Sequence, residues 1–146
     1  MITSLDSMVI DANSEAMGVG IPALMDNAGK AVSSVLTERF RGKRFAFVCG
    51  SGNNGGDGIT AAGMMGNEDV TIYLLRPAGS IRSEHVGKVL KELKCQIKDF
   101  SEFESSRYDV IVDCALGTGI SGEVRPPYDG FIRMANDFNG YVVSVD

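Results

Sequence analysis

Short apolar runs alternate along this chain with longer segments in which apolar residues recur every three or four positions. The short runs predict buried strands at 45–49, 69–75, 95–97, 110–114 and 141–145. The longer segments predict helices at 55–66, 80–93 and 127–136, and two more, at 5–17 and 22–40, precede the first strand. The polar, acidic stretch 101–107 predicts a solvated connection.

Strands that alternate with helices are typical of a parallel sheet covered by helices on both faces. We therefore expect an α/β fold, a doubly wound, Rossmann-like three-layer α/β/α domain. Right-handed crossovers favour the strand order 3-2-1-4-5, in which the chain reverses direction between strands 1 and 4. Such folds bind ligands at that reversal, and the two loops that meet there, 50–58 and 115–126, are both rich in glycine and polar residues.

The first of these loops contains five glycines in nine positions, together with Asn53, Asn54 and Asp57. Glycine allows left-handed backbone angles and close approach to a ligand. A helix that starts here directs its free amides into the same space as the asparagine and aspartate oxygens. The pattern predicts a ligand-binding turn; the alternative, a tight strand-to-helix turn without a ligand, needs only one or two glycines.

Residues 50–55 also satisfy the G-x-G-x-x-G pattern of dinucleotide dehydrogenases. However, Arg76-Pro77 replaces the acidic residue that those enzymes carry at the end of the second strand, and no second domain is visible for a hydride acceptor. Arg76 could pair a 2′-phosphate, or it could be a surface arginine that closes the strand. A P-loop is excluded, because no Gly-Lys-Ser/Thr follows the glycines.

Asp113 lies at the end of the apolar strand 110–114. Burying a carboxylate there is costly unless a cation or several hydrogen-bond donors meet it. With the side-chain oxygen of Asn54 across the chain reversal, Asp113 could hold a hard metal ion, for which oxygen ligands are the expected type. It could equally cap the amides of its own loop, and the residues alone leave both possibilities open.

Two further features belong to the same edge of the predicted sheet. Gly117, Gly119 and Gly122 free the backbone amides of the second loop to approach a phosphate. Asp146, the final residue, follows the fifth strand, where a carboxylate is placed for proton transfer.

Composition and charge limit the classes of function. The 146 residues make one domain, and a formal net charge of −5 argues against a broad nucleic-acid or anionic-membrane surface. No stretch of about 18 apolar residues and no signal-like leader is visible, so we expect a cytoplasmic protein. Cys49, Cys95 and Cys114 are expected to be reduced thiols, and the only histidine, His85, is expected to be solvated in the middle of a helix.

Four segments carry a family resemblance: 25–29, 53–58, the 113–119 loop with Pro127-Tyr128 behind it, and the ending 142–146. In this order and spacing they resemble the YjeF N-terminal domain family, the NAD(P)HX epimerases. Members interconvert the two epimers at C6 of hydrated NADH and NADPH, called NADHX and NADPHX, so that an ADP- or ATP-dependent dehydratase can restore the cofactor. The resemblance implies an isomerase, an NAD(P)H-hydrate epimerase of cofactor repair, coupled to such a dehydratase and possibly fused to it.

The resemblance also implies roles for individual residues. Asp146 is implied to be the catalytic residue, an acid and base near the reacting ring, and Asn54 and Asp113 are implied to bind a potassium ion. A homo-oligomer is implied as well. The residues implied to bind the substrate are Asn53, Asn54, Gly55, Gly56, Asp57, Gly117, Thr118, Gly119, Ile120, Ser121, Gly122, Glu123 and Asp146.

The chain departs from the family pattern in two ways. Asp26 stands where the family usually has glutamate, and the family continues beyond Asp146 with a serine that completes the metal site. Residues 1–146 are therefore expected to form a domain truncated at its C-terminal side. A noncatalytic nucleotide-binding or interaction module is the alternative function, although the presence of Asn54, Asp57, Asp113 and Asp146 favours the enzyme. A nucleotide-dependent dehydrogenase is a third possibility, which would change the absorbance of the reduced cofactor.

Overall fold

The computed structural model describes residues 9–10, 13–14, 16–66, 68–117, 120 and 122–145. Its strands form one parallel sheet in the order β3-β2-β1-β4-β5, which confirms the predicted topology. The strands are β1 (Arg44–Cys49), β2 (Asp69–Leu74), β3 (Gln96–Asp99), β4 (Val110–Cys114) and β5 (Tyr141–Ser144).

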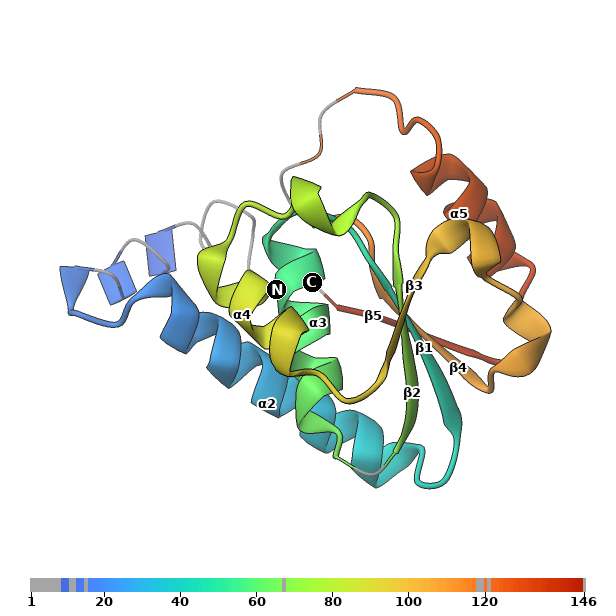
Figure 1. Ribbon diagram of the computed structural model, residues 1–146, viewed down its shortest axis with the longest axis horizontal. Helices are drawn as coiled ribbons and strands as arrows, with labels where there is room; N and C mark the ends of the chain where they lie inside the picture. The colour runs from blue at the N-terminus through green and yellow to red at the C-terminus, as the bar shows by residue number, and fades with distance from the viewer. Residues whose placement is uncertain are drawn as a thin grey trace.

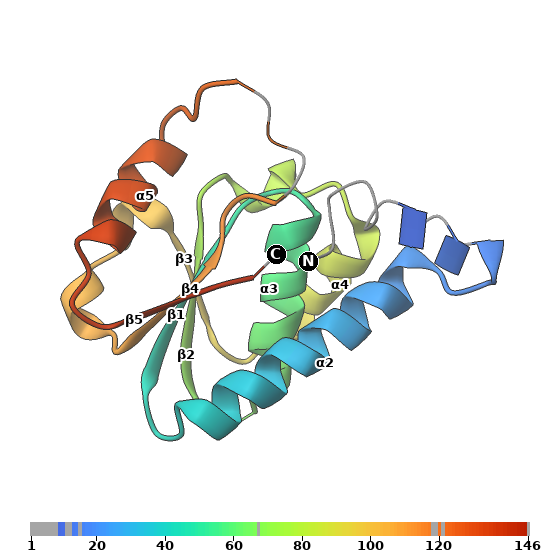
Figure 2. The ribbon, with the colours of Figure 1, turned by 180° about the vertical axis from the view of Figure 1, so that it is seen from behind.

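Helices cover both faces of the sheet, as the alternating pattern predicts (Figures 1 and 2). One face is covered by α2 (Ile21–Arg39), α3 (Asn53–Met64) and α4 (Glu84–Glu92). The other is covered by α5 (Tyr128–Asn136) and by two 3-10 turns, Phe100–Glu102 and Ser105–Arg107. A third 3-10 turn, Ala78–Ser80, follows β2. None of the described helices is long and apolar enough to cross a membrane.

The central strand β1 shows why these apolar runs form a buried sheet. Phe45, Phe47 and Cys49 pack into the core under α2, α3 and α4, whereas Ala46 and Val48 pack into the core under α5. All five side chains are almost completely buried. Successive residues of a strand point to opposite faces, so a strand that is buried on both faces has no polar alternation.

Small residues allow α2 and α3 to cross closely. A Cβ atom on Gly29 of α2 would lie 2.8 Å from Thr60 Cγ2, and a Cβ on Gly56 of α3 would lie 2.8 Å from Met25 Cε. Met25 is itself buried in the core. The 25–29 segment is therefore a packing motif that holds α3, and with it the loop before α3, in position.

Two local predictions are only partly right. The stretch 101–107 connects β3 to β4 and is mostly exposed, as predicted, but its 3-10 turns direct Phe103 inward; Phe103 is 9% exposed and its ring centroid lies 4.9 Å from that of Tyr73. His85 is not in the middle of a helix, because α4 begins at Glu84 with Ser83 as its cap. Its side chain is 23% exposed, and its Nε2 lies 2.9 Å from Asp26 Oδ1 on α2.

The structure also tests the predictions for the cysteines and for the helix at 5–17. All three cysteines are free thiols, as expected, with Cys49 and Cys114 buried and Cys95 half-buried. The predicted helix at 5–17 lies partly outside the described residues; of those that are described, 9–10, 13–14 and 16 are helical and Met17 is in a turn.

Candidate functional site

The two glycine-rich loops start side by side at the carboxyl edge of the sheet. β1 and β4 pair in parallel with Cys49 opposite Cys114, and the Gly50 amide donates to the Cys114 carbonyl at 3.0 Å. The chain reversal predicted from the strand order is therefore present, and residues from both loops are in contact there.

Close backbone packing explains most glycines of the 50–58 loop. A Cβ on Gly50 would overlap the Ala115 carbonyl oxygen, one on Gly55 would overlap the Gly50 carbonyl oxygen, and one on Gly58 would overlap Cys114 Sγ. None of these glycines has a positive φ, so left-handed angles are not the reason for them. Gly52, by contrast, faces open space. The loop is thus tightly packed at Gly50, Gly55 and Gly58 and open to solvent at Gly52.

Helix α3 begins in this accessible region. Its N-cap is Gly52, whose carbonyl accepts from the Gly56 amide at 3.1 Å and which has no side chain of its own to cap the first turn. Helix geometry leaves the first-turn amides without intrahelical acceptors, and the helix dipole favours a negative charge beside them. The first turn also carries no acidic residue. This end of α3 suits a phosphate group.

Asn54 ties the two loops together. Its Nδ2 donates to the Leu116 carbonyl at 2.9 Å, and a Cβ on Gly117 would lie 3.2 Å from Asn54 Cβ. Because Nδ2 is engaged with Leu116, Oδ1 is the Asn54 atom that a bound cation or a donor would use.

Asp113, near the end of β4, belongs to the strand that leads into the second loop and is half-buried. Its Oδ1 accepts from the Ala115 amide at 3.0 Å, so it does cap its own loop. Burial raises the pKa of the Asp113 carboxyl, and the hydrogen bonds from the Ala115 amide and the Ser144 hydroxyl act in the opposite direction. A half-buried carboxylate with a raised pKa gains from a cation beside it.

The oxygen atoms of Asn54 and Asp113 are of the kind that a hard cation such as potassium prefers. Among the described residues, no group of three or more His, Cys, Asp or Glu side chains could hold a metal ion. The residues that are present nevertheless fit an alkali cation, because such an ion takes amide, carbonyl and carboxylate oxygens and needs no such group.

The other predicted site residues fall into three groups. Asn53 is exposed and Asp57 is half-buried in the first turns of α3, whereas Gly55 and Gly56 are buried. In the second loop, Ile120, Gly122 and Glu123 are exposed, and Gly122 has a φ of 81°. Four predicted residues lie outside the described part of the chain: Thr118, Gly119, Ser121 and Asp146.

Two contacts at this edge were missed by the sequence analysis. Ser144 on β5 stands in register with Asp113 and hydrogen-bonds to it. Tyr128, the first residue of α5, lies against the first loop, with its Cε1 3.5 Å from the position of a Cβ on Gly50. The strand register could have indicated Ser144, but no sequence signal indicates that Tyr128 reaches across to Gly50.

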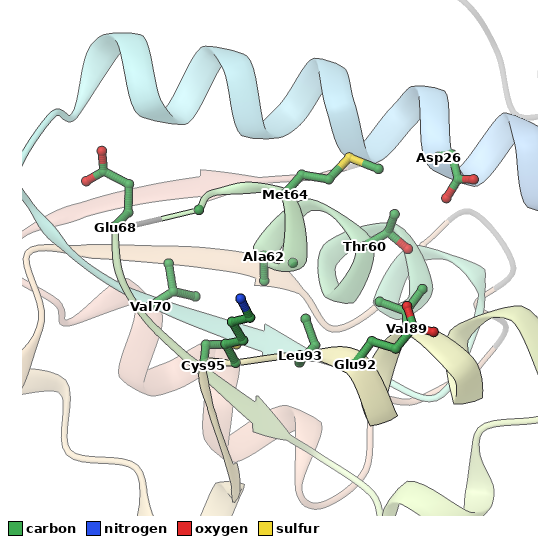
Figure 3. Close-up of a pocket in the computed structure, with 13 residues that line it drawn as sticks. Asp26, Thr60, Ala62, Met64, Glu68, Val70, Val89, Glu92, Leu93 and Cys95 are labelled. Atoms are coloured by element: carbon green, nitrogen blue, oxygen red, sulfur yellow. The ribbon is translucent and has the colours of Figure 1, made fainter.

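Two cavities of the described structure lie away from this edge. The first, of about 430 Å³, lies beside α3 and α4 and is lined by residues such as Thr60, Val89 and Leu93 (Figure 3). Thr60 Oγ1 is buried there without a hydrogen-bond partner among the described residues. The second, of about 480 Å³, includes Arg44 and Asp109 at the opposite end of β1 and β4. Neither is lined by Asn54, Asp113 or the α3 N-terminus.

A parallel sheet in the order 3-2-1-4-5, with a glycine-rich turn opening a helix at the chain reversal, defines the class of doubly wound nucleotide-binding folds. Within that class the chain belongs to the family described as YjeF-related protein N-terminus, which matches residues 22–146.

Three known proteins illustrate the relationship. The bifunctional NAD(P)H-hydrate repair enzyme Nnr of Archaeoglobus fulgidus is 34% identical over 146 residues, which cover 99% of this chain and 31% of that enzyme. The NAD(P)H-hydrate epimerase of Cenarchaeum symbiosum is 35% identical over 145 residues, covering 94% of this chain and 68% of that protein. The crystal structure of yeast ynu0, YNL200c, has a TM-score of 0.81 at 21% identity, covering 96% of this chain and 68% of that one.

The chain spans about a third of the length of the bifunctional enzymes that it matches. The likeness to the yeast structure, at 21% identity, supports the fold.

Proposed function

We propose that this domain is an NAD(P)H-hydrate epimerase, which interconverts the epimers at the hydroxyl-bearing C6 of hydrated NADH and NADPH. The observation that carries the proposal is the 35% identity to an NAD(P)H-hydrate epimerase over 94% of the chain. Further support comes from the contact between Asn54 and the 113–117 loop at the α3 N-terminus, because it offers both an anion site and carboxylate chemistry in one place.

The proposed reaction is a reversible loss and return of water. The C6 hydroxyl of the substrate is part of a hemiaminal, so when an acid protonates it, the lone pair of the ring nitrogen expels water and a C=N bond forms. Water then adds to the opposite face of C6 and returns its proton to the same group. The overall step is balanced and needs neither an oxidant nor a reductant.

We propose that Asp146 is this acid and base. Support comes from β5, because the Val145 amide donates to the Asp113 carbonyl at 2.9 Å and the chain therefore leaves β5 beside Asp113 at the carboxyl edge. A positioned general acid and base contributes about 10²- to 10⁴-fold to a rate.

We further propose that the other residues bind and orient the substrate. The first-turn amides of α3, from Asn53 to Gly55, bind the negatively charged phosphates together with the backbone around Gly117. Asn54 and Asp113 hold a potassium ion, which when bound supplies a positive charge beside the phosphates. Gly50, Gly55 and Gly58 set the separation of the loops, because a methyl group at any of these positions would overlap a neighbouring atom.

The bifunctional relatives combine two NAD(P)H-hydrate repair activities by name. We propose that the product of this domain passes to an NAD(P)H-hydrate dehydratase, and that the domain acts as a homo-oligomer. Sedimentation of the purified protein, which would give a mass above that of one chain, tests the second point.

The experiment is an interconversion assay with a purified single epimer of NADHX, followed by chromatography. Wild-type protein is expected to accelerate the approach to the epimer mixture, and Asp146→Asn to reduce that rate by about 100-fold or more. Asp137→Asn, an exposed aspartate after α5, is the matched control and should leave the rate unchanged. Undiminished activity of Asp146→Asn would remove Asp146 from the proposed role, and an inactive wild type would refute the function.

A further inference from the structure

An arginine follows β2 at the same edge as the candidate site. The Leu75 amide donates to the Cys49 carbonyl at 3.0 Å, so β2 runs alongside β1 up to the start of the glycine-rich loop. Arg76 comes next and is exposed. Its side chain therefore starts one strand away from the N-terminus of α3.

The guanidinium group of Arg76 is directed across this edge. Its carbon lies 5.8 Å from the centroid of the Tyr128 ring, and its Nη2 lies 3.5 Å from the Pro126 carbonyl oxygen. Tyr128 also lies against the loop at Gly50. Arg76 thus reaches from the end of β2 to the segment that leads into α5, and among the described residues no carboxylate forms an ion pair with it.

The order of the strands orients a dinucleotide along this edge. In the proposed function the reacting ring lies beyond β5, and the phosphates lie at the start of α3, between β4 and β1. Neighbouring strands are about 4.8 Å apart, so the end of β2 is about 14 Å from the end of β5. The adenosine half of the substrate therefore falls beside β2.

In doubly wound folds, the residue at the end of the second strand reads the 2′ position of the adenosine ribose. An acidic residue there accepts the 2′-hydroxyl of NAD, and a nearby arginine accommodates the 2′-phosphate of NADP. Here Arg76 stands in that place, and Pro77, Ala78 and Gly79 follow it without an acidic side chain. A guanidinium fork forms paired, charge-assisted hydrogen bonds with phosphate.

We infer that Arg76 is a specificity-determining residue that binds the 2′-phosphate of hydrated NADPH, so that the domain prefers NADPHX to NADHX. The inference rests on the proposed function, because that function sets the direction in which the dinucleotide lies. Tyr128 holds the guanidinium group at the edge before the substrate arrives.

The test compares epimerisation of NADPHX and NADHX by wild type, Arg76→Gln and Arg76→Lys. Charge-assisted hydrogen bonds contribute about 1.5 to 3 kcal/mol, which converts to a loss of about 10- to 150-fold in kcat/KM. We expect this loss for Arg76→Gln with NADPHX alone and a smaller loss for Arg76→Lys, which keeps the charge but not the fork. Arg82→Gln is the matched control: it removes a neighbouring exposed charge and should leave both substrates unaffected.

A binding measurement separates this inference from the proposed function. In calorimetric titrations, adenosine 2′,5′-bisphosphate is expected to bind wild type more tightly than adenosine 5′-monophosphate, and Arg76→Gln is expected to remove that difference. Wild-type protein that is inactive on both epimers, yet shows this difference, would refute the epimerase and retain the adenosine site. Equal losses with NADHX and NADPHX, no loss with either, or equal binding of the two adenosine nucleotides would each overturn the role of Arg76.

Discussion

Gly58 is the position where an added methyl group should disturb the site most directly. It lies in the second turn of α3, above the ends of β1 and β4. The Cβ of an alanine there would overlap Cys114 Sγ, would lie 2.6 Å from Cys114 Cβ and would lie 3.2 Å from Cys49 Sγ. Both cysteines are 1% exposed or less, so neither side chain has space to move.

The size of the effect follows from two opposing contributions. Alanine is favoured over glycine in a helix interior by about 1 kcal/mol. Overpacking a tight core costs about 1–3 kcal/mol, and the close contacts with the buried strand residue Cys114 favour the upper value. We therefore expect Gly58→Ala to lower the free energy of unfolding by about 2 kcal/mol.

Gly87→Ala is the matched control, because Gly87 lies within α4 and a Cβ added there would have no heavy atom of another element within 4 Å. It should raise the free energy of unfolding by about 1 kcal/mol through helix propensity alone. Urea unfolding followed by circular dichroism measures both variants, with an unchanged m-value showing that stability alone has changed. A Gly58→Ala variant as stable as wild type would refute the proposed packing of α3 on β4.

Three other variants test different parts of the structure. The raised pKa of Asp113 means that wild type loses stability as pH rises through that pKa, so Asp113→Asn should raise the melting temperature at pH 7 without potassium. The same variant should lose any stabilisation by potassium chloride. The hydrogen bond from Arg44 lowers the pKa of Asp109 to about 2, so the stability that this pair contributes is lost as pH falls from about 4 towards 2. In acid titrations, Asp109→Asn should lose that pH dependence of stability. Phe103→Ala should cost about 3–4 kcal/mol in urea unfolding, and a loss below 1 kcal/mol would contradict the burial of Phe103 against Tyr73.

The results for the first two of these variants can also contradict the roles given to Asp113 and Asp109. If Asp113→Asn responds to potassium as wild type does, Asp113 is not a ligand of that ion. If Asp109→Asn unfolds in acid with the same pH dependence as wild type, the pair with Arg44 does not contribute to stability between pH 2 and 4.

The sequence predicted the sheet well because its strands are buried on both faces. Phe45 to Cys49 read as an uninterrupted apolar run, and the run is indeed the central strand. Handedness and chain reversal then required the loops after β1 and β4 to meet, which the Gly50–Cys114 hydrogen bond confirms. Periodicity and topology rules are sufficient for these features because they depend on which faces are buried.

Contacts between side chains distant in the sequence could not be predicted in the same way. His85 and Asp26 are 59 residues apart, and only the packing of α4 beside α2 brings them within 2.9 Å. Arg76 reaches toward Tyr128 for a similar reason. The sequence also suggested ligand approach for glycines such as Gly55, whereas the structure shows that Gly55 is needed against the Gly50 carbonyl. Composition shows that glycine is abundant, but only the packing shows what each glycine contacts.

The place where the dinucleotide binds can be mapped residue by residue. Backbone amide chemical shifts would be measured by NMR as NADP⁺ is added in potassium buffer. We expect shifts at residues 52–55 and 115–117, on either side of the contact between Asn54 and Leu116, and little change around Thr60, Val89 and Leu93 in the cavity beside α4. Shifts confined to that cavity, with residues 52–55 unchanged, would contradict the placement of the site at the carboxyl edge of the sheet.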